Sequence, residues 1–555
     1  MTPKRSDNAD RGVVLCAYAG DGNILLAWDL DPKQTANLAG FAVKCKPSKS
    51  PAYIIPNRVS FQTAFTSDTT TEQRTWTPST EAPIQRFSWL DILKDSDPGP
   101  YQYTVTAMYF NPDAAHLKAG AKATVTVSKD DLPYKNLQMG FTRGYLSSQA
   151  YATQFKNAPI EPVQKSIDFD TTPFQAQYEW LGGHARKMLF DFLAECTADP
   201  SISVDVFAYD FNEPDVIRAL AKLGPRLRLF LDNASLHTKP GALEPVAQAL
   251  LAKSAGAANV KTGHFQRFAH SKVMIQKKNG KAIKVLTGSA NFAIRGLYIQ
   301  ANNVLVFNDP VIADLYAQAF EQAFTDMAGF SLAPIAAQWF KEPATPGRPA
   351  AQFAFSPHKT FNVSLDEVAQ AIQGAQSSVL FAIMELAGGG PAFDAIKALG
   401  NRSIFTYGMT QNELSDLTIF SAGNPNGVVV PFSFLSKHVP APFVQEWNGG
   451  FGQVIHHKFV VVDFNGKNPK LFTGSSNLAA GGEEQNGDNM IGFSDPALAA
   501  RYAVEAIRLV DHYSFRASLK NATTVAPLTL STGDWWKPYY DPANLKCHAK
   551  QVLIA

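Results

Sequence analysis

The chain contains two copies of one 34-residue segment, and this repeat restricts the fold more than any other feature. The segments from His270 to Asn303 and from His456 to Asn489 align without a gap, 186 positions apart, and share 13 of 34 residues. A repeated unit is expected to pack against its copy about a two-fold axis. Residues at equal positions in the two copies should then face each other across one cleft.

The residues that the copies share are suited to phosphate chemistry. The first copy contributes His270, Lys272, Ser289 and Asn291, and the second contributes His456, Lys458, Ser475 and Asn477. A histidine can act as nucleophile or as general acid and base, because its pKa lies near neutral pH. Lysine, asparagine and serine side chains can bind the non-bridging oxygens of a phosphoryl group. The pattern therefore predicts one active site with two His-x-Lys sets.

Each motif is expected to lie on a β-hairpin. Apolar or β-branched residues follow each lysine, and an Asn-Gly pair comes next, at 279–280 and at 465–466. Asn-Gly favours the type I′ turn that joins two neighbouring antiparallel strands. The return strands then end at the Gly-Ser pairs 288–289 and 474–475. All four residue types should therefore meet at one rim of a sheet.

Residues 10–135 have a different pattern. Short runs rich in β-branched and aromatic residues alternate there with clusters of Gly, Pro, Asp and Ser. In the run from Tyr101 to Phe110 every second residue is apolar, which is typical of a strand half buried in a β-sandwich. The pattern resembles a fibronectin type III module. Spacer, dimerisation and substrate-docking roles are all open for this part.

Alternating helices and strands follow the β-rich part. We expect an α/β unit with a connecting segment over 136–342, a second α/β unit over 350–520, and a C-terminal tail over 521–555 that packs on the core. Lys341 to Pro349 has three prolines in nine residues, which is linker composition.

Composition gives little support for several classes of protein. The net charge is +2, from 50 basic and 48 acidic residues, so we expect no bulk attraction to nucleic acid or to an anionic membrane. Four cysteines are too few and too scattered for a disulfide framework. The first residues lack the apolar core of a signal peptide, and no run reaches membrane-spanning length. We expect a cytoplasmic monomer without integral membrane contact, with export by a signal-less route left open.

The paired motifs carry a resemblance to a known family. His-x-Lys-x(4)-Asp followed by Gly-Ser-x-Asn, occurring twice, resembles the phospholipase D superfamily over about residues 173–516. The resemblance implies an α/β fold, a duplicated α/β/α sandwich, which here follows an all-β sandwich. It also implies a covalent phosphohistidine and no metal or other cofactor. In agreement, no cluster of carboxylates with metal-ligand spacing accompanies the motifs.

One residue departs from the family pattern. The motif aspartate is present as Asp463 in the second copy but is replaced by Lys277 in the first. The resemblance implies a largely structural role for this aspartate. We therefore expect altered packing of the first hairpin and retained activity.

The resemblance also implies that an acidic or amide residue orients the histidine of the opposite copy. At that offset the chain has Asn302 in the first copy and Asp488 in the second. Asp488 would then support positive charge on His270, which makes His270 the nucleophile and leaves His456 as general acid and base. The same asymmetry resembles tyrosyl-DNA phosphodiesterases within the superfamily.

The resulting hypothesis is a metal-independent phosphodiesterase. We expect catalysis by His270, Lys272, His456, Lys458 and Asp488, and substrate binding by Ser289, Asn291, Ser475, Asn477 and Asn302. A phospholipid headgroup ester is the preferred substrate; the alternative is a nuclease or a nucleic-acid end-processing enzyme, and transfer to an alcohol stays open beside hydrolysis. A non-catalytic scaffold would require a lost histidine or lysine, and none is missing. Because the β-rich part contributes no motif residue, we expect it to be dispensable for hydrolysis of a small diester.

Overall fold

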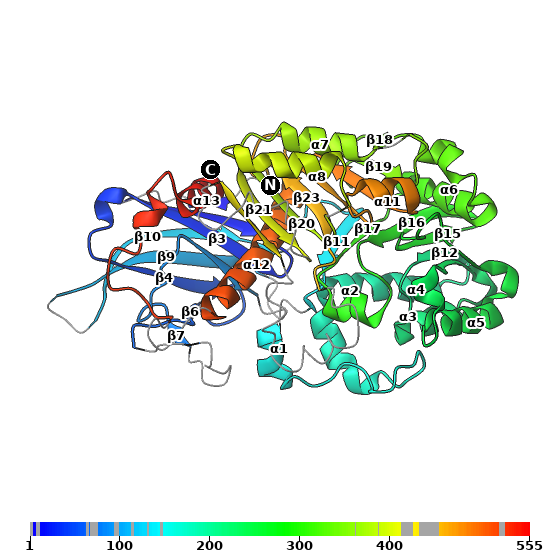
Figure 1. The fold of residues 1–555 in the computed structure, drawn as a ribbon. Helices are drawn as coiled ribbons and strands as arrows, with labels where there is room; N and C mark the ends of the chain where they lie inside the picture. Colours follow the sequence, from blue (N-terminus) through cyan, green and yellow to red (C-terminus); the bar gives the residue numbers. More distant parts are fainter. Residues whose placement is uncertain are drawn as a thin grey trace.

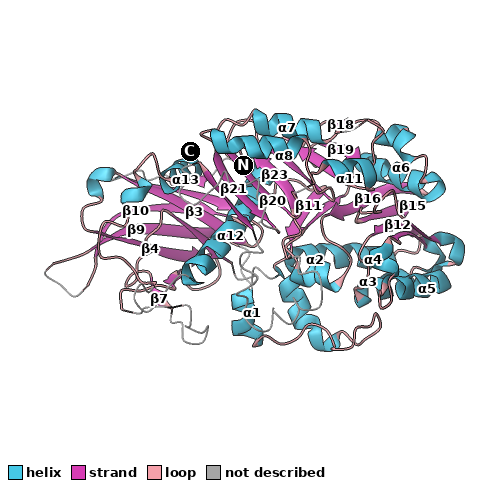
Figure 2. Cartoon of the chain, viewed as in Figure 1, coloured by secondary structure: helices cyan, strands magenta, loops and turns pink. Residues whose placement is uncertain are grey.

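The protein combines antiparallel β-sheets at its N-terminus with two mixed α/β sheets (Figures 1 and 2). The computed structural model describes residues 4–6, 12–62, 66, 76–93, 99–112, 116–129, 132–144, 148–360, 362–386, 388–411, 426–431, 454–520 and 528–555. Among the helices in these ranges, none has both the length and the apolar composition needed to span a membrane.

The N-terminal part is a pair of four-stranded antiparallel sheets that enclose one core. The first sheet has the order β1 (Lys4–Arg5), β2 (Val13–Ala19), β3 (Asn23–Leu30) and β8 (Ser88–Ile92). The second has the order β10 (Lys118–Val127), β9 (Tyr101–Tyr109), β4 (Leu38–Pro47) and β5 (Tyr53–Ile54), and the short strands β6 (Pro56–Asn57) and β7 (Thr77–Pro78) pair separately. Trp28, Phe41 and Tyr103 are fully buried between the sheets. Along β9 buried residues alternate with more exposed ones, which confirms the predicted half-buried strand.

The first α/β part is built on a seven-stranded sheet. The strand order is β11 (Leu137–Phe141), β17 (Asn303–Phe307), β16 (Lys281–Gly288), β15 (Val273–Lys278), β12 (Ile202–Ala208), β13 (Leu227–Asp232) and β14 (Val260–Gly263). Its helices are α1 (Ser148–Phe155), α2 (Gln175–Ala198), α3 (Pro214–Ala221), α4 (Ser235–Thr238), α5 (Glu244–Ala255), a π-helix (Arg295–Ile299) and α6 (Pro310–Asp326).

The second α/β part repeats this topology with one additional edge strand. The order is β18 (Phe340–Glu342), β19 (Ala351–Phe355), β25 (Asn489–Phe493), β24 (Lys470–Gly474), β23 (Lys458–Val462), β20 (Ser378–Ile383), β21 (Phe405–Thr410) and β22 (Gly427–Pro431). Its helices are α7 (Leu365–Gln373), α8 (Pro391–Ala398), α11 (Ala480–Gln485) and α12 (Pro496–Lys520). The repeat seen in the sequence is therefore a repeat of a whole sheet with its helices.

Helices α6 and α12 occupy equal places in the two parts and lie in the central core between the sheets. Each begins at an Asp-Pro pair. Asp309 accepts hydrogen bonds from the amides of Val311 and Ile312, and Asp495 accepts one from the amide of Leu498. An aspartate at the N-cap with proline at the next position is a strong helix start, because it satisfies free amides and fixes the first φ.

The two motif hairpins differ at their turns. Asn279 and Gly280 have φ values of 53° and 78°, so the first hairpin has the predicted type I′ turn. The predicted two-residue turn at 465–466 is wrong, because β23 ends at Val462 and β24 starts only at Lys470. Asp463 has a φ of 51° and ends the strand there.

The replaced motif aspartate accounts for this difference in packing. The Asp463 carboxylate accepts hydrogen bonds from the amides of residues 376–378, at the start of β20. In the first part Lys277 instead forms an ion pair with Asp205 of β12, with 2.6 Å between Nζ and Oδ2, and Arg228 binds the same carboxylate. The first hairpin is thus held by an ion pair where the second is held by backbone hydrogen bonds, in line with the altered packing expected.

The C-terminal tail crosses the β-sandwich. Trp535 and Tyr539 pack against its core, and Trp535 Nε1 donates to the carbonyl of Leu38. The last helix, α13 (Leu545–Ile554), lies over β3, where Lys550 forms a 2.6 Å ion pair with Asp29. The tail therefore fastens the sandwich to the rest of the chain.

The sandwich and the α/β parts also share buried surface. Cys16, Tyr18, Leu25 and Ala27 of β2 and β3 belong to the same buried cluster as the apolar face of α12. In Figure 1 helix α12 lies between the strands of the sandwich and the eight-stranded sheet. Removal of the β-rich part, which is predicted to be dispensable for hydrolysis, would therefore expose part of this core.

Candidate active site

The two motif segments meet where the two sheets adjoin. His270 and Lys272 directly precede β15, while His456 directly precedes β23 and Lys458 is its first residue. Backbone bridges cross between the parts on both sides, at Phe268–Asn486 and at Ala301–Ile455. Each histidine is thereby brought next to the end of the opposite repeat.

Asp488 lies directly behind His270. Its Oδ1 is 2.7 Å from His270 Nδ1 and also accepts a 2.7 Å hydrogen bond from Ser475 Oγ. Both side chains are almost fully buried, at 5% and 1% exposure. Burial alone would raise the pKa of Asp488, but His270 and Lys272 lower it to about 2. An ionised carboxylate here fixes the tautomer with a proton on Nδ1 and leaves Nε2 free to react.

Asn302 takes the same place behind His456, with 2.8 Å between Asn302 Oδ1 and His456 Nδ1. Asn302 Nδ2 donates to the carbonyl of Gly296 in the π-helix, so the amide oxygen must face the histidine. Ser289 Oγ donates to the same oxygen at 2.7 Å. One histidine is therefore supported by a charged acceptor and the other by a neutral one.

The hydroxyls of Ser289 and Ser475 are engaged in this support. Each donates to the residue behind a histidine, and each also accepts from a backbone amide, that of Asn303 or Asn489. These bonds differ from the direct phosphate contacts expected from the sequence. The serines hold the supporting residues in place.

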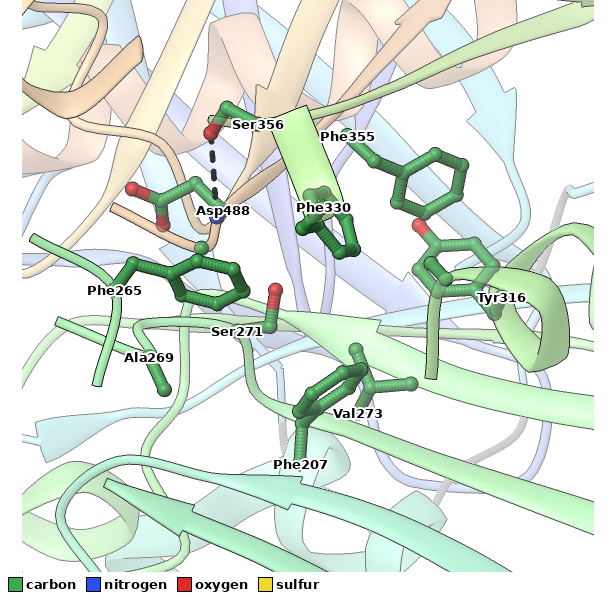
Figure 3. Close-up of a pocket in the computed structure, with 12 residues that line it drawn as sticks. Phe207, Phe265, Ala269, Ser271, Val273, Tyr316, Phe330, Phe355, Ser356 and Asp488 are labelled. Atoms are coloured by element: carbon green, nitrogen blue, oxygen red, sulfur yellow. Dashed lines mark hydrogen bonds between the residues drawn. The ribbon is translucent and has the colours of Figure 1, made fainter. Parts of the chain in front are cut away.

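A hydroxyl clamp that the sequence analysis missed holds the backbone of each supporting residue. Thr142 follows β11 and exchanges two hydrogen bonds with Asn302: its amide donates to the Asn302 carbonyl at 3.0 Å, and its Oγ1 accepts from the Asn302 amide at 2.9 Å. Ser356 follows β19 and does the same for Asp488, at 3.0 and 3.2 Å (Figure 3). Both follow a phenylalanine at a strand end, but their spacing differs from 186 positions, so a gapless comparison of the copies does not align them.

A small apolar pocket lies beside Asp488 (Figure 3). Its walls carry aromatic side chains from both parts, including Phe207, Phe265 and Phe355. Such surroundings exclude water from one side of the Asp488–His270 pair and strengthen the electrostatic interaction within it.

Both lysines are buried beside the histidines. Lys272 Nζ donates to the carbonyl of His270, and Lys458 Nζ donates to the carbonyl of His456 at 2.9 Å. Burial lowers the pKa of Lys272 to about 7, against the opposing effect of Asp488 and other carboxylates. Burial and the charge of Lys272 lower the pKa of Lys458 well below its ordinary value. An anion bound between them would reverse this shift, so the pair is suited to a phosphate group.

The histidines are neutral at neutral pH. Burial and the charge of Lys272 lower the pKa of His270 to about 4, although Asp488 opposes the shift. Burial, Lys458 and Lys272 hold the pKa of His456 well below its ordinary value. A neutral imidazole with its proton on Nδ1 has a free lone pair on Nε2, which is the state that a nucleophile needs.

The two motif asparagines complete the site. Asn291 is fully buried and its Nδ2 donates to Asp210 Oδ2 at 2.6 Å. Within the described ranges, Oδ1 of Asn291 and Oδ1 of Asn477 have no hydrogen-bond partner. A polar atom buried without a partner is costly, and a bound substrate can supply that partner.

A second buried histidine supports Asn291 from behind. His237 lies between two carboxylates, with Nε2 at 2.9 Å from Asp210 and Nδ1 at 2.7 Å from Asp232. Although burial opposes it, these hydrogen bonds raise the pKa of His237 to about 9. Asp232 also accepts from the amide of Ala269, next to His270. The sequence analysis did not identify this network, because Asp210 and Asn291 come from segments distant from His237 in the chain.

Asp210, His237 and Glu244 are the one group of described residues whose ligand atoms lie close enough to hold a metal ion. Both ring nitrogens of His237 already face carboxylates, and Glu244 accepts from the amide of Phe211. The close approach of these ligand atoms is explained by a protonated His237 between two carboxylates, without a metal ion.

Comparisons with known proteins point to one family. Residues 193–324 match the sequence profile of a family described as "Cardiolipin synthase, PLD-like domain". No curated protein matches the chain.

Among the solved structures that align with this chain, three show the range of similarity. Phosphatidylserine synthase from Haemophilus influenzae aligns with a TM-score of 0.41 and 11% identity, over 58% of this chain and 84% of its own. Yeast tyrosyl-DNA phosphodiesterase aligns with a TM-score of 0.28 and 11% identity, over 54% and 84%. Nuc from Salmonella typhimurium, a phospholipase D family member, aligns with a TM-score of 0.20 and 21% identity, over 24% and 84%.

Proposed function

The chain belongs to the phospholipase D superfamily, and we propose that it cleaves a phosphodiester through a covalent phosphohistidine on His270. The proposal rests on one observation: each motif histidine is hydrogen-bonded to a residue of the opposite copy, and one of these residues is charged while the other is neutral. His270 is 2.7 Å from the Asp488 carboxylate, and His456 is 2.8 Å from the Asn302 amide oxygen. A carboxylate stabilises the positive charge that develops on an attacking imidazole, and a neutral amide leaves the other ring free to exchange its proton.

In the first step, His270 Nε2 attacks phosphorus and the bond to the leaving oxygen breaks. His456 gives its proton to that oxygen. The pKa of His456 is low in the empty site, so the proton must arrive with the substrate, whose anionic phosphate offsets the charges of Lys272 and Lys458. The two lysines then stabilise the negative charge on the non-bridging oxygens.

In the second step, water attacks the phosphohistidine. His456 takes a proton from the water, the N–P bond breaks, and its electron pair returns to His270. Both steps are displacements at phosphorus with positive charge supplied by lysine, so we propose that no divalent metal takes part.

The preferred substrate is a phospholipid headgroup ester. The preference is supported by the net charge of +2, which offers little bulk attraction to a nucleic-acid polyanion. The alternative is a nucleic-acid end-processing enzyme. It is favoured by the amide at position 302 and the carboxylate at position 488, because this asymmetry resembles tyrosyl-DNA phosphodiesterases. We also propose the division of a monomeric chain into units 10–135, 136–342, 350–520 and 521–555, with the first unit similar to a fibronectin type III module.

The test is product analysis on four diesters in parallel: phosphatidylcholine, cardiolipin, single-stranded DNA and bis(p-nitrophenyl) phosphate. Rapid acid-free quenching and intact-mass measurement should detect a phosphoryl adduct that is absent in His270→Ala. Release of a headgroup or of DNA ends selects between the two substrate classes. Turnover by His270→Ala at the wild-type rate, or cleavage of none of the four diesters, would overturn the proposal.

A further inference from the structure

The turn between β2 and β3 reaches from the β-sandwich into the first α/β part. Asp21 lies at the tip of this turn, and its Oδ2 accepts a 2.6 Å hydrogen bond from the amide of Phe141, the last residue of β11. Its Oδ1 is 3.1 Å from Nδ1 of His184 on α2. One carboxylate of the sandwich therefore joins a strand and a helix of the α/β part.

This turn is tightly docked. The Asp21 side chain is 10% exposed, and an added Cβ on Gly20 would come within 2.8 Å of Val504 on α12. Burial would raise the pKa of Asp21, but His184 and the Phe141 amide hold it below its ordinary value, so the carboxylate is ionised. An ionised acceptor makes the bond to the Phe141 amide a strong one.

The position of β11 explains why such a bond is needed. In the seven-stranded sheet β11 is an edge strand and pairs only with β17, whereas its counterpart β19 lies between β18 and β25. An edge strand has free backbone groups on its outer side. Asp21 binds one of them at the residue directly before Thr142.

From Thr142 the chain of contacts continues to a motif histidine. Thr142 forms two hydrogen bonds with the backbone of Asn302, one through its amide and one through its hydroxyl, and Asn302 Oδ1 is 2.8 Å from His456 Nδ1. The corresponding clamp on Asp488 is made by Ser356, which follows the doubly paired strand β19. Among the described residues, the clamp behind His456 is thus the one of the two that is joined to the sandwich through Asp21.

We propose that Asp21 is a positioning residue for His456, and that the β-sandwich is thereby a working part of the active site. This inference rests on the proposed function, in which His456 is the general acid and base. Loss of the Asp21 carboxylate would release the end of β11, loosen Thr142 and Asn302, and shift the His456 ring. The reaction of His270, which is held from the other part, should be spared.

The test compares Asp21→Ala with Arg86→Gln. Arg86 also joins the sandwich to the α/β part, through an ion pair of 2.7 Å with Asp511 of α12, but it has no part in the chain of contacts to His456. The substrate is bis(p-nitrophenyl) phosphate, because p-nitrophenolate leaves without protonation. Asp21→Ala should release one equivalent in a burst, accumulate phosphohistidine, and turn over about 10- to 100-fold more slowly, the cost of a misplacement near 1 Å.

Arg86→Gln should lower the melting temperature without a burst. Asp21→Asn, which keeps one acceptor oxygen for the Phe141 amide, should restore most of the turnover. If Asp21→Ala does not fold, Thr142→Val is the second variant. It removes the hydroxyl that accepts from the Asn302 amide and should give the same burst.

The inference is overturned if Asp21→Ala or Thr142→Val behaves like Arg86→Gln, with no burst and no adduct. An inactive wild-type protein would instead count against the proposed phosphodiesterase function. The two failures are therefore distinguishable.

Discussion

Replacing Asp488 with asparagine tests the role of the negative charge beside His270, the proposed nucleophile, with little change in shape. Asp488 Oδ1 accepts from His270 and Ser475, and an amide oxygen can keep both bonds, as Asn302 Oδ1 does for His456 and Ser289. Within the described part of the chain Oδ2 accepts no hydrogen bond, so an amide nitrogen there breaks none. The substitution thus removes the charge and keeps the contacts.

The expected cost follows from the kind of hydrogen bond that is lost. A hydrogen bond to a charged group contributes about 1.5–3 kcal/mol, and one between neutral groups about 0.5–1.5 kcal/mol. The difference of about 1–2 kcal/mol applies to the transition state, in which positive charge grows on the His270 ring. It corresponds to a rate about 5- to 30-fold lower for the first step.

The measurement is the single-turnover release of p-nitrophenolate by Asp488→Asn with enzyme in excess. Ser475→Ala is the matched control, because it removes the other donor to the same oxygen and leaves the charge. A first step as fast as in wild type in Asp488→Asn, or an equal loss in Ser475→Ala, would refute the assignment of charge support to Asp488.

Three further results are expected. His270→Ala should block the first step with every substrate. His456→Ala should lower the rate about 10²–10⁴-fold with poor leaving groups and should accumulate the adduct on His270 with p-nitrophenyl esters. An adduct on His456 in the His270→Ala protein would reverse the roles. Dialysis against EDTA should leave turnover unchanged, because the lysines supply the positive charge; a loss restored by Mg²⁺ or Zn²⁺ would contradict this. The pKa of His237 is raised to about 9 in the folded protein, so protonation of this ring should stabilise the fold by about 3 kcal/mol below pH 6.5 and lose that effect as pH rises through 9. The free energies of unfolding of wild type and His237→Gln, measured with denaturant, should therefore converge at high pH. A difference that stays constant with pH would exclude the imidazolium.

The part of the site that could be predicted from the sequence consists of residues within the repeat. Equal spacing predicted that residues at equal positions in the two copies would face each other across one cleft, because a duplicated unit packs about a two-fold axis. The support of His270 and His456 by the opposite copy was implied by the resemblance to the phospholipase D superfamily. The first hairpin was also predictable, since Asn279-Gly280 encodes its turn locally. The same dipeptide at 465–466 does not form the predicted two-residue hairpin turn, because Asp463 binds the backbone ahead of β20 and ends the strand early.

The supporting contacts could not be predicted in the same way. Thr142, Ser356 and His237 lie outside the repeated segments, and each acts through one or two hydrogen bonds to a residue far away in the chain. A threonine after a strand has no sequence signature that separates a clamp from a solvated hydroxyl. The contact of Asp21 was equally hard to predict, because its partner Phe141 is 120 residues away and in another part of the fold.

The exchange of supporting residues between the two copies has an evolutionary consequence. In a dimer of identical subunits every substitution appears twice, so both histidines would have the same residue behind them. Fusion of the copies into one gene product frees each position to change alone, and a carboxylate and an amide now occupy equivalent places at Asp488 and Asn302. Lys277 and Asp463, which occupy equivalent positions in the two copies, also differ. Covalent linkage of the two copies thus allows two equivalent positions to carry different residues, as the different roles proposed for His270 and His456 require.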